Sequence, residues 1–237
     1  MTLGLQWTAA SPAIAEPICM AGSQTDLVRF ETVLGDMEVV LCSEDSPITV
    51  ANFLSYVDDG SYTNDVIVHR SVQGNDCTNG DGICIIQGGG FFIDDQGIMD
   101  AVPAMDPIGL EGDGPHEPYS IAMARTDDPI SATNQWFINV TKNTFNNEHT
   151  VFGEVVVGRN VVDVIAAQET WRLNAGPLSD TPLIDYPDDG SSHVPYFVYV
   201  TDIVRLPEPG AGLSIGAGLA TLMWLARRRA SGLASSG

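Results

Sequence analysis

The chain has 237 residues, of which 31 are Asp or Glu and 10 are Lys or Arg, so its formal net charge is −21 at pH 7. This charge argues against nucleic acid or an anionic lipid surface as a partner, because both require clustered basic side chains. The hydrophobic content of 44% is ample for a packed core, so a folded chain of one large domain or two small ones is expected.

Residues 1–15 have part of the pattern of a secretory signal peptide. Ala13-Ile14-Ala15 offers a small-residue cleavage site after a short, mildly apolar run, but the positively charged region that normally precedes such a run is missing. The signal is therefore either weak or begins upstream of Met1. Residues 16–26 are expected to form an N-terminal extension.

Secondary-structure signals begin with a β-hairpin at residues 27–41, where apolar and polar residues alternate on both sides of a turn at Leu34-Gly35. A helix is expected next, with Ser46 as its N-cap, Pro47 in its first turn and Gly60 as its stop signal. Strand-like runs follow at residues 66–70, 83–87, 119–125, 135–140 and 150–156.

The C-terminal part of this region contains a second helix at residues 158–169 and a closing strand at residues 196–204. Residues 171–194 are rich in Asn, Gly, Pro, Ser and Asp, which predicts a long surface loop. Many strands with two helices indicate an all-β (mainly β) class and a closed antiparallel barrel capped by helices. No second domain is evident.

The four cysteines are candidates for disulfides if the chain is exported. Four cysteines allow three pairings. Cys77 and Cys84 flank a short loop and are the favoured local pair, so Cys19 and Cys42 would tie the N-terminal extension to an early strand. Because there is no C-x-x-C pattern and no nearby histidine, no metal is expected.

The C-terminal region has the order Pro207-Glu208-Pro209, an apolar run of 17 residues at 210–226, and three arginines at 227–229. One interpretation is a plain membrane anchor, since the run is just long enough for a transmembrane helix. The other is that residues 207–229 resemble the PEP-CTERM sorting signal of Gram-negative bacteria, which an exosortase is thought to remove. Residues 230–237 would then be a cytoplasmic tail.

The common catalytic patterns are absent from the sequence. There is no G-x-S-x-G motif, and the glycine triplet at residues 88–90 has neither dinucleotide-binding spacing nor a following lysine. His116 and His193 lie in Pro-rich segments and are expected to be solvated. Composition and spacing alone therefore indicate only a secreted β-barrel with a small ligand site.

Six segments in order carry a more specific signal: FETVLGDMEVVL, TVANFLSYV, HR, QGGGF, IAMARTDDPISATNQWFIN and HTVFGEVVVG. Together they resemble the cyclophilin family of peptidyl-prolyl cis-trans isomerases over residues 27–206. The resemblance implies an eight-stranded antiparallel barrel capped by two α-helices. It also implies an enzyme that rotates X–Pro bonds without a cofactor.

In that family the arginine of the His-Arg pair is the main catalytic residue, and Arg70 matches it. Amide resonance gives X–Pro rotation a barrier of roughly 18–20 kcal/mol, and a guanidinium can stabilise the twisted amide. The resemblance implies substrate contacts of four kinds. Gln87 and Gln135 would be polar contacts, and Phe137 and Phe145 would be the floor and wall of a proline pocket. Ala122 and Met123 would be a strand segment that pairs with the peptide. His149 would lie at the rim of the pocket, and Ile85, just before Gln87, would be an apolar contact.

The sequence departs from the family pattern between Arg70 and Gln87. Sixteen residues separate them, more than is usual, and Cys84 and Ile85 stand where the family has larger apolar residues, which predicts a shallower pocket. The expected function is isomerisation of X–Pro bonds in exported proteins. A catalytically weak module that binds Pro-containing segments is the alternative, and a purely structural barrel is less favoured.

The expected partners are Pro-containing segments of exported proteins and an exosortase-like processing enzyme. The expected location is the periplasm, outer surface or extracellular matrix of a Gram-negative bacterium. A monomer is expected.

Overall fold

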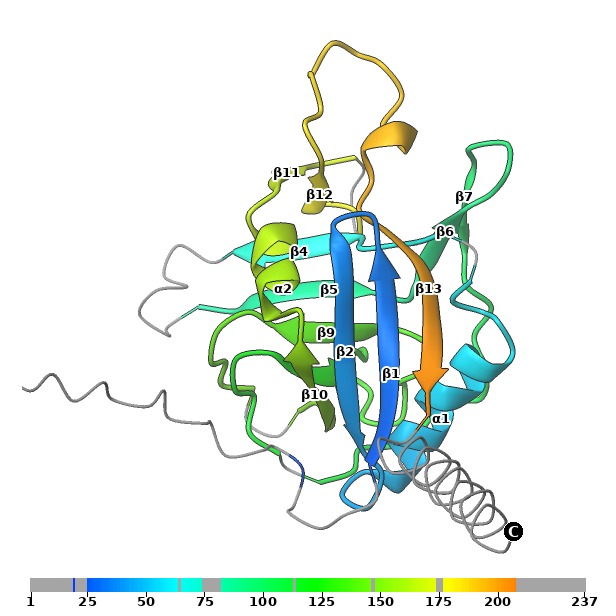
Figure 1. Cartoon of the computed structure of the whole chain (residues 1–237), viewed down its shortest axis with the longest axis vertical. Helices are drawn as coiled ribbons and strands as arrows, with labels where there is room; N and C mark the ends of the chain where they lie inside the picture. Colours follow the sequence, from blue (N-terminus) through cyan, green and yellow to red (C-terminus); the bar gives the residue numbers. More distant parts are fainter. Residues whose placement is uncertain are drawn as a thin grey trace, which may run out of the picture.

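A computed structural model of the chain describes Cys19 and residues 25–63, 65–73, 82–112, 114–145, 148–173 and 177–207. These residues form a mainly-β body with two α-helices, as the sequence predicts (Figure 1). The helical elements are α1 (Pro47–Asp58), α2 (Arg159–Ala166) and the 3-10 turn η1 (Val194–Tyr196). The strands are β1 (Thr25–Thr32), β2 (Gly35–Cys42), β3 (Val66–Ile67), β4 (Arg70–Gln73), β5 (Cys84–Gly88), β6 (Phe91–Ile93), β7 (Met99–Ala101), β8 (Ser120–Met123), β9 (Trp136–Asn139), β10 (Val151–Val157), β11 (Glu169–Trp171), β12 (Thr181–Leu183) and β13 (Tyr199–Leu206).

Eleven of these strands form one antiparallel sheet in the order β4-β5-β9-β8-β10-β2-β1-β13-β3-β6-β7. The sheet curls into a half-barrel, so that β4, β5 and β9 cross the direction of β1, β2 and β13 (Figure 1). Strands β3 and β4 are separated by only Val68 and His69. The Val68 amide donates to the Val198 carbonyl at 2.9 Å, and the His69 amide donates to the Gln87 carbonyl at 3.0 Å.

The predicted hairpin and first helix are confirmed as β1–β2 and α1. Ser46 occupies the N-cap position, but its hydroxyl donates to the Val151 carbonyl and does not cap the helix. The carboxylate of Glu111 accepts the amide hydrogens of Ile48 and Thr49 at 3.1 and 2.5 Å instead. A side chain 63 residues away therefore supplies the negative charge that a helix N-terminus favours.

The remaining strand predictions are confirmed with shifted ends, and the second helix is shorter than predicted. The run at 66–70 is divided between β3 and β4, and the closing strand starts three residues later than expected. Strands β6 and β7 were not predicted, because each has only three residues and too few positions to establish a period of two.

The main core lies between the curled sheet and the two helices α1 and α2. Phe30 of β1 stacks with Phe53 of α1 at a ring-centroid distance of 6.0 Å and meets Trp136 of β9 edge-on at 5.1 Å. All three side chains are fully buried. Alternation along β1 and β2 places one residue in two in this core, which is why the hairpin pattern was readable from the sequence.

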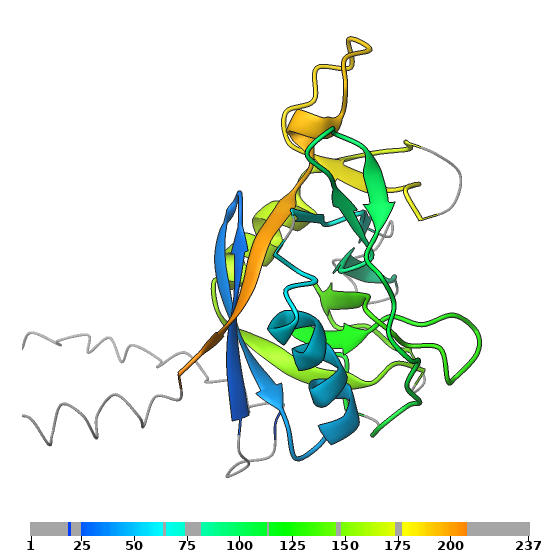
Figure 2. The same cartoon turned by 90° about the vertical axis from the view of Figure 1, so that its right-hand side faces the viewer.

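Residues 171–194 are not simply the long surface loop that their composition predicts. Strand β12 pairs with β11, and Leu183 of β12 is 1% exposed in a second apolar cluster with Ile67 and Phe197. The Pro, Gly and Asp residues mark turns, while isolated apolar residues anchor the segment. The part between β12 and η1 protrudes from the body (Figures 1 and 2).

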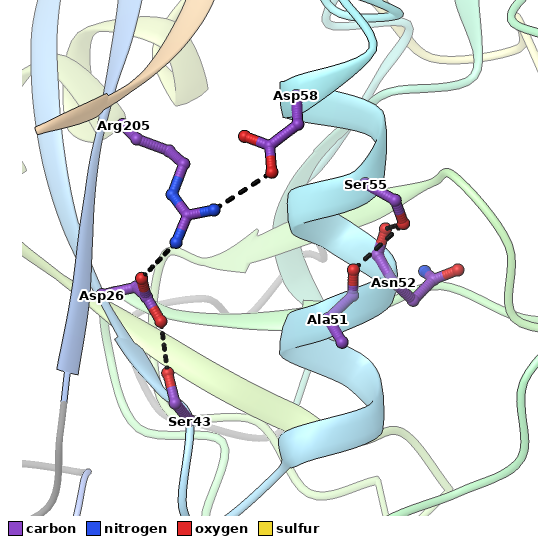
Figure 3. Close-up of polar contacts among 7 residues, drawn as sticks. All are labelled: Asp26, Ser43, Ala51, Asn52, Ser55, Asp58 and Arg205. Atoms are coloured by element: carbon purple, nitrogen blue, oxygen red, sulfur yellow. Dashed lines mark hydrogen bonds and ion pairs between the residues drawn. The ribbon is translucent and has the colours of Figure 1, made fainter.

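An ion-pair cluster joins the first strand, the first helix and the last strand (Figure 3). Arg205 of β13 contacts Asp26 of β1 at 2.7 Å and Asp58 of α1 at 3.0 Å. The Ser43 hydroxyl donates to Asp26 at 2.8 Å. One guanidinium therefore neutralises two carboxylates from elements distant in the sequence.

The expected disulfide between Cys19 and Cys42 is present, with a Cα–Cα distance of 5.0 Å. Cys84 is not a free thiol, and its expected partner Cys77 lies outside the described residues. The expected signal peptide and the sorting signal, apart from Pro207, also lie outside them. Among the described residues, no helix is long and apolar enough to span a membrane.

Candidate active site

Strands β4 and β5 bring Arg70 and Gln87 together, because the two residues are directly opposite in the strand register. The Arg70 Nη1 to Gln87 Oε1 distance is 3.4 Å, at the long end of hydrogen-bond geometry. Gln87 in turn donates through Nε2 to Oε1 of Gln135 at 2.9 Å. The three polar residues expected from the sequence therefore form a line of side chains across neighbouring strands.

Beside this line lies a small apolar cluster that differs from the main core. Ile85, Ala122, Phe137 and Val151 are its buried members, and Phe145 packs against it partly exposed. Phe137 and Phe145 meet edge-to-face at a centroid distance of 5.5 Å. The structure thus gathers the expected floor, wall and apolar neighbour of the proline pocket in one place.

His149 completes the rim of this cluster. Its ring is perpendicular to Phe137 and Phe145, at centroid distances of 5.2 and 5.1 Å. Its Nδ1 lies 3.1 Å from the carbonyl oxygen of Met123. These aromatic edge contacts and this one polar contact fix the orientation of the half-buried His149 ring.

Met123 contributes to this site through its backbone. Strand β8 alternates, so Ala122 faces the apolar cluster while the Met123 side chain is buried in the main core. The Met123 amide already donates to the Thr150 carbonyl at 3.1 Å. Pairing of this segment with a peptide stays a prediction.

His116 is a residue of the site that the sequence analysis missed. It was expected to be solvated, but it is only 5% exposed. Its ring stacks on Phe137 with an interplanar angle of 10° and meets Phe145 edge-on at 4.6 Å. The Pro-rich surroundings correctly indicate irregular backbone, but nothing local reveals that the histidine turns inward beneath an aromatic residue 21 positions later.

Burial decides the charge of the histidines near the site. Burial, with a further contribution from His149, lowers the pKa of His116 to about 4. Burial, together with the charge of Arg70, lowers the pKa of His69 to about 4. The pKa of His149 is also lowered, chiefly by burial and less by the charge of Arg125. At neutral pH these rings are therefore neutral, and Arg70 lies next to an uncharged histidine.

Two hollows differ in their relation to these residues. One of about 180 Å³ adjoins Gln87 and Gln135 and is otherwise lined by Ala124, Arg125, Thr126, Ser131 and Thr133. A shallow one of about 560 Å³ runs along α1, and none of the expected site residues borders it. No group of three potential metal ligands occurs in the described part of the chain.

The arrangement places a cation beside an apolar cluster, and within the described residues no histidine or carboxylate is set to activate a nucleophile. Such a site suits binding of an apolar side chain next to a polar backbone group, together with electrostatic stabilisation of a rearranging amide.

Residues 27–186 match the family model described as cyclophilin type peptidyl-prolyl cis-trans isomerase/CLD. Peptidyl-prolyl cis-trans isomerase A of Dickeya dadantii (strain 3937) is 34% identical over 186 residues, which cover 75% of this chain and 86% of that protein. Peptidyl-prolyl cis-trans isomerase B of Escherichia coli (strain K12) is 37% identical over 170 residues, which cover 67% and 94%. The chain belongs to the cyclophilin family of peptidyl-prolyl cis-trans isomerases, and these relatives support isomerase function.

A comparison with solved structures supports the same fold. A crystal structure of a cyclophilin type peptidyl-prolyl cis-trans isomerase from Cryptosporidium parvum has a TM-score of 0.55 at 20% identity, and covers 78% of this chain and 100% of that chain. At this identity the likeness establishes the fold alone.

Proposed function

We propose that this chain is a peptidyl-prolyl cis-trans isomerase in which Arg70 is the catalytic residue. Rotation about an X–Pro bond faces a barrier of roughly 18–20 kcal/mol because amide resonance is lost. In the twisted state the proline nitrogen is pyramidal and its lone pair is localised. A hydrogen bond from the guanidinium stabilises this state more than either planar isomer, which lowers the barrier.

The observation that carries this proposal is the register that sets Arg70 opposite Gln87, beside the apolar cluster around Phe137. A proline ring seated on Phe137 would lie next to the guanidinium. Gln87 and Gln135 would hold the polar backbone of the substrate and the arginine itself. Phe145, His149, Ile85 and the strand segment Ala122–Met123 would bound the pocket. No proton transfer, metal or cofactor is required.

Kinetics of the whole chain on an Ala-Pro peptide test this proposal. Arg70→Ala is expected to lower kcat/KM about 100-fold, the order found when one transition-state donor is removed. Arg70→Lys is expected to recover little, because an ammonium lacks the planar fork of donors. Equal rates for the wild type and Arg70→Ala, with both folded, would favour the alternative of a module that only binds Pro-containing segments.

We also infer that β3, Val68, His69 and β4 act as one continuous strand. This strand would pair with β13 through β3 and with β5 through β4, and so close the eight-stranded barrel expected for residues 27–206. The hydrogen bonds that the Val68 and His69 amides donate to opposite neighbours, Val198 and Gln87, support this continuity. Hydrogen exchange tests it, since both amides should be protected as strongly as those of β1.

We further propose that the chain is exported by a Gram-negative bacterium and acts as a monomer on Pro-containing segments of exported proteins. The Cys19–Cys42 disulfide supports an oxidising compartment. Residues 207–229 would be the sorting signal that an exosortase-like enzyme removes. Mass spectrometry of the protein recovered from its native host tests this, because a mature protein that still carries residues 210–229 would contradict processing.

A further inference from the structure

The outer edge of β4, which carries Arg70, is held by residues from far along the chain. β4 is the last strand in the sheet order, with β5 on its inner side. On the outer side, the Ser71 amide donates to the Asp180 carbonyl at 2.7 Å. The Thr181 hydroxyl donates to the His69 carbonyl at 2.9 Å. The residues immediately before and after Arg70 are therefore both tied to one dipeptide.

This dipeptide is itself rigidly supported. Thr181 is fully buried, and it begins β12, which pairs with β11 through Trp171↔Thr181. Leu183, two residues later, is anchored in the apolar cluster with Ile67 and Phe197. Asp180 and Thr181 thus present fixed acceptor and donor groups to β4.

The guanidinium of Arg70 needs such support from its backbone. Its contact with Gln87 is 3.4 Å long and constrains the side chain only weakly. Even if β3 and β4 form one continuous strand, only β3 pairs with β13, and no described strand pairs with the outer side of β4. A strand with one free row of backbone groups is more easily displaced than one paired on both sides. A displacement of about 1 Å in a catalytic group can lower a rate by about two orders of magnitude.

We propose that Thr181 is a positioning residue for the isomerase reaction, which acts by fixing the backbone on which Arg70 stands. Its hydroxyl holds the His69 carbonyl, while the neighbouring Asp180 carbonyl holds the Ser71 amide. Thr181 does not touch the substrate. The proposal rests on the catalytic role proposed for Arg70.

Two substitutions separate this role from simple packing. Thr181→Val keeps the side-chain shape and removes the hydroxyl, whereas Thr181→Ser keeps the hydroxyl and removes the methyl group. If the hydroxyl positions Arg70, the valine variant is impaired and the serine variant is not. If Thr181 only fills space, the serine variant is the more impaired of the two.

Thr49→Val is the matched control. Thr49 is also fully buried, and its hydroxyl donates to Glu111 Oε2 at 2.7 Å on α1, away from the candidate site. Thr49→Val loses one hydroxyl hydrogen bond, as Thr181→Val does. If both variants lose a comparable amount of stability, a difference in kcat between them can be assigned to the position of Arg70.

The experiment measures kcat and KM of the whole chain on an Ala-Pro peptide, together with the NMR resonance of the Arg70 Nε–H group. Thr181→Val is expected to lower kcat about fivefold with KM within twofold of the wild type, and to move the resonance. Thr181→Ser and Thr49→Val are expected to stay within twofold in kcat and to leave the resonance in place.

A wild-type kcat in Thr181→Val, or a serine variant as slow as the valine variant, would overturn the positioning role. An inactive wild type, or an Arg70→Ala variant as fast as the wild type, would instead overturn the proposed function. In that case the NMR measurement alone decides the positioning claim. An unmoved Arg70 resonance in Thr181→Val overturns it, and a moved one with Thr49→Val unchanged supports it.

Discussion

The imidazole of His116 lies parallel to the ring of Phe137, with an angle of 10° and a centroid distance of 5.8 Å. Nδ1 of His116 is 3.3 Å from Nδ2 of Asn139. His116 therefore forms a second aromatic layer beneath the floor of the proposed proline pocket.

Replacement of His116 is expected to change substrate binding more than turnover. His116→Asn keeps a polar partner for Asn139 but removes the ring beneath Phe137, so the floor loosens. KM for an Ala-Pro peptide should rise several-fold with a smaller change in kcat, the pattern of lost uniform binding. His116→Phe retains the stack and should keep KM closer to the wild type. Steady-state kinetics check this, and a larger KM for His116→Phe than for His116→Asn would contradict it.

Stability is expected to fall on mild acidification because two histidines are buried in the neutral form. The folded-state pKa values of His69 and His116 are about 4, below the ordinary value of 6.5. Their contribution is complete above pH 6.5 and is lost as the pH falls from 6.5 towards 4. Each histidine loses up to about 1.4 kcal/mol per pH unit in that window.

Urea unfolding at pH 7.0 and 5.5 measures this effect before most carboxylates titrate. The free energy of unfolding should be about 2 kcal/mol lower at pH 5.5 if both histidines remain buried. An unchanged value at the two pH values would show that the rings gain protons in the folded state without penalty.

Gly89 is expected to tolerate no side chain. Its φ is +83°, and an added Cβ would lie 2.4 Å from the Asn134 carbonyl oxygen and 2.9 Å from Trp136. Gly89→Ala should therefore lower the free energy of unfolding by about 2–4 kcal/mol, from overpacking plus left-handed backbone strain.

Gly190 supplies the control for this prediction, because its φ is +77° with nothing within 4 Å of an added Cβ. Gly190→Ala should cost about 1–2 kcal/mol from backbone strain alone. Thermal or urea unfolding of both variants compares the two costs. Equal losses would mean that the contact with Asn134 and Trp136 relaxes freely.

Arg205 is expected to contribute modestly to stability, in a way that depends on salt. Arg205→Ala leaves Asp26 and Asp58 without their shared cation, so unfolding should become easier by about 1 kcal/mol at low ionic strength. Added salt should shrink the difference, because it screens exposed charges.

Arg29→Ala is the comparison for this cluster, since Arg29 pairs with the single carboxylate of Glu38 at 2.9 Å. The loss in free energy of unfolding should be smaller for Arg29→Ala than for Arg205→Ala. Urea unfolding in 0.05 and 0.5 M NaCl tests both statements, and a salt-independent loss in Arg205→Ala would indicate packing of the arginine stem instead of charge.

Local patterns were enough to predict much of the scaffold. The hairpin β1–β2 follows from alternation around Gly35, and α1 follows from Pro47 and the apolar spacing before Gly60. The positions of Arg70, Gln87 and the apolar cluster came from resemblance of whole segments, since no spacing rule picks out a lone arginine that acts without a nucleophile.

Composition gave a wrong prediction where a few buried residues fix a segment that consists mostly of turn-forming residues. Residues 171–194 contain mostly loop formers, yet Leu183 is buried and Thr181 reaches the strand of Arg70. Ser46 matched the N-cap pattern, but Glu111 performs the capping. In each case the deciding partner lies dozens of residues away, beyond the window in which a pattern can be recognised.

The sequence by itself determined the class of fold, the order of its main elements and the presence of an arginine in a cyclophilin-like setting. Tertiary structure alone decided that His116 lies beneath Phe137 and that β12 secures the edge of β4. The physical reason is that alternation and capping signals act between neighbours in the chain, whereas burial of a ring and support of an edge strand depend on chain closure. The Thr181 hydroxyl reaches the His69 carbonyl across 112 residues although β12 belongs to a separate two-stranded sheet, and no local pattern encodes that contact.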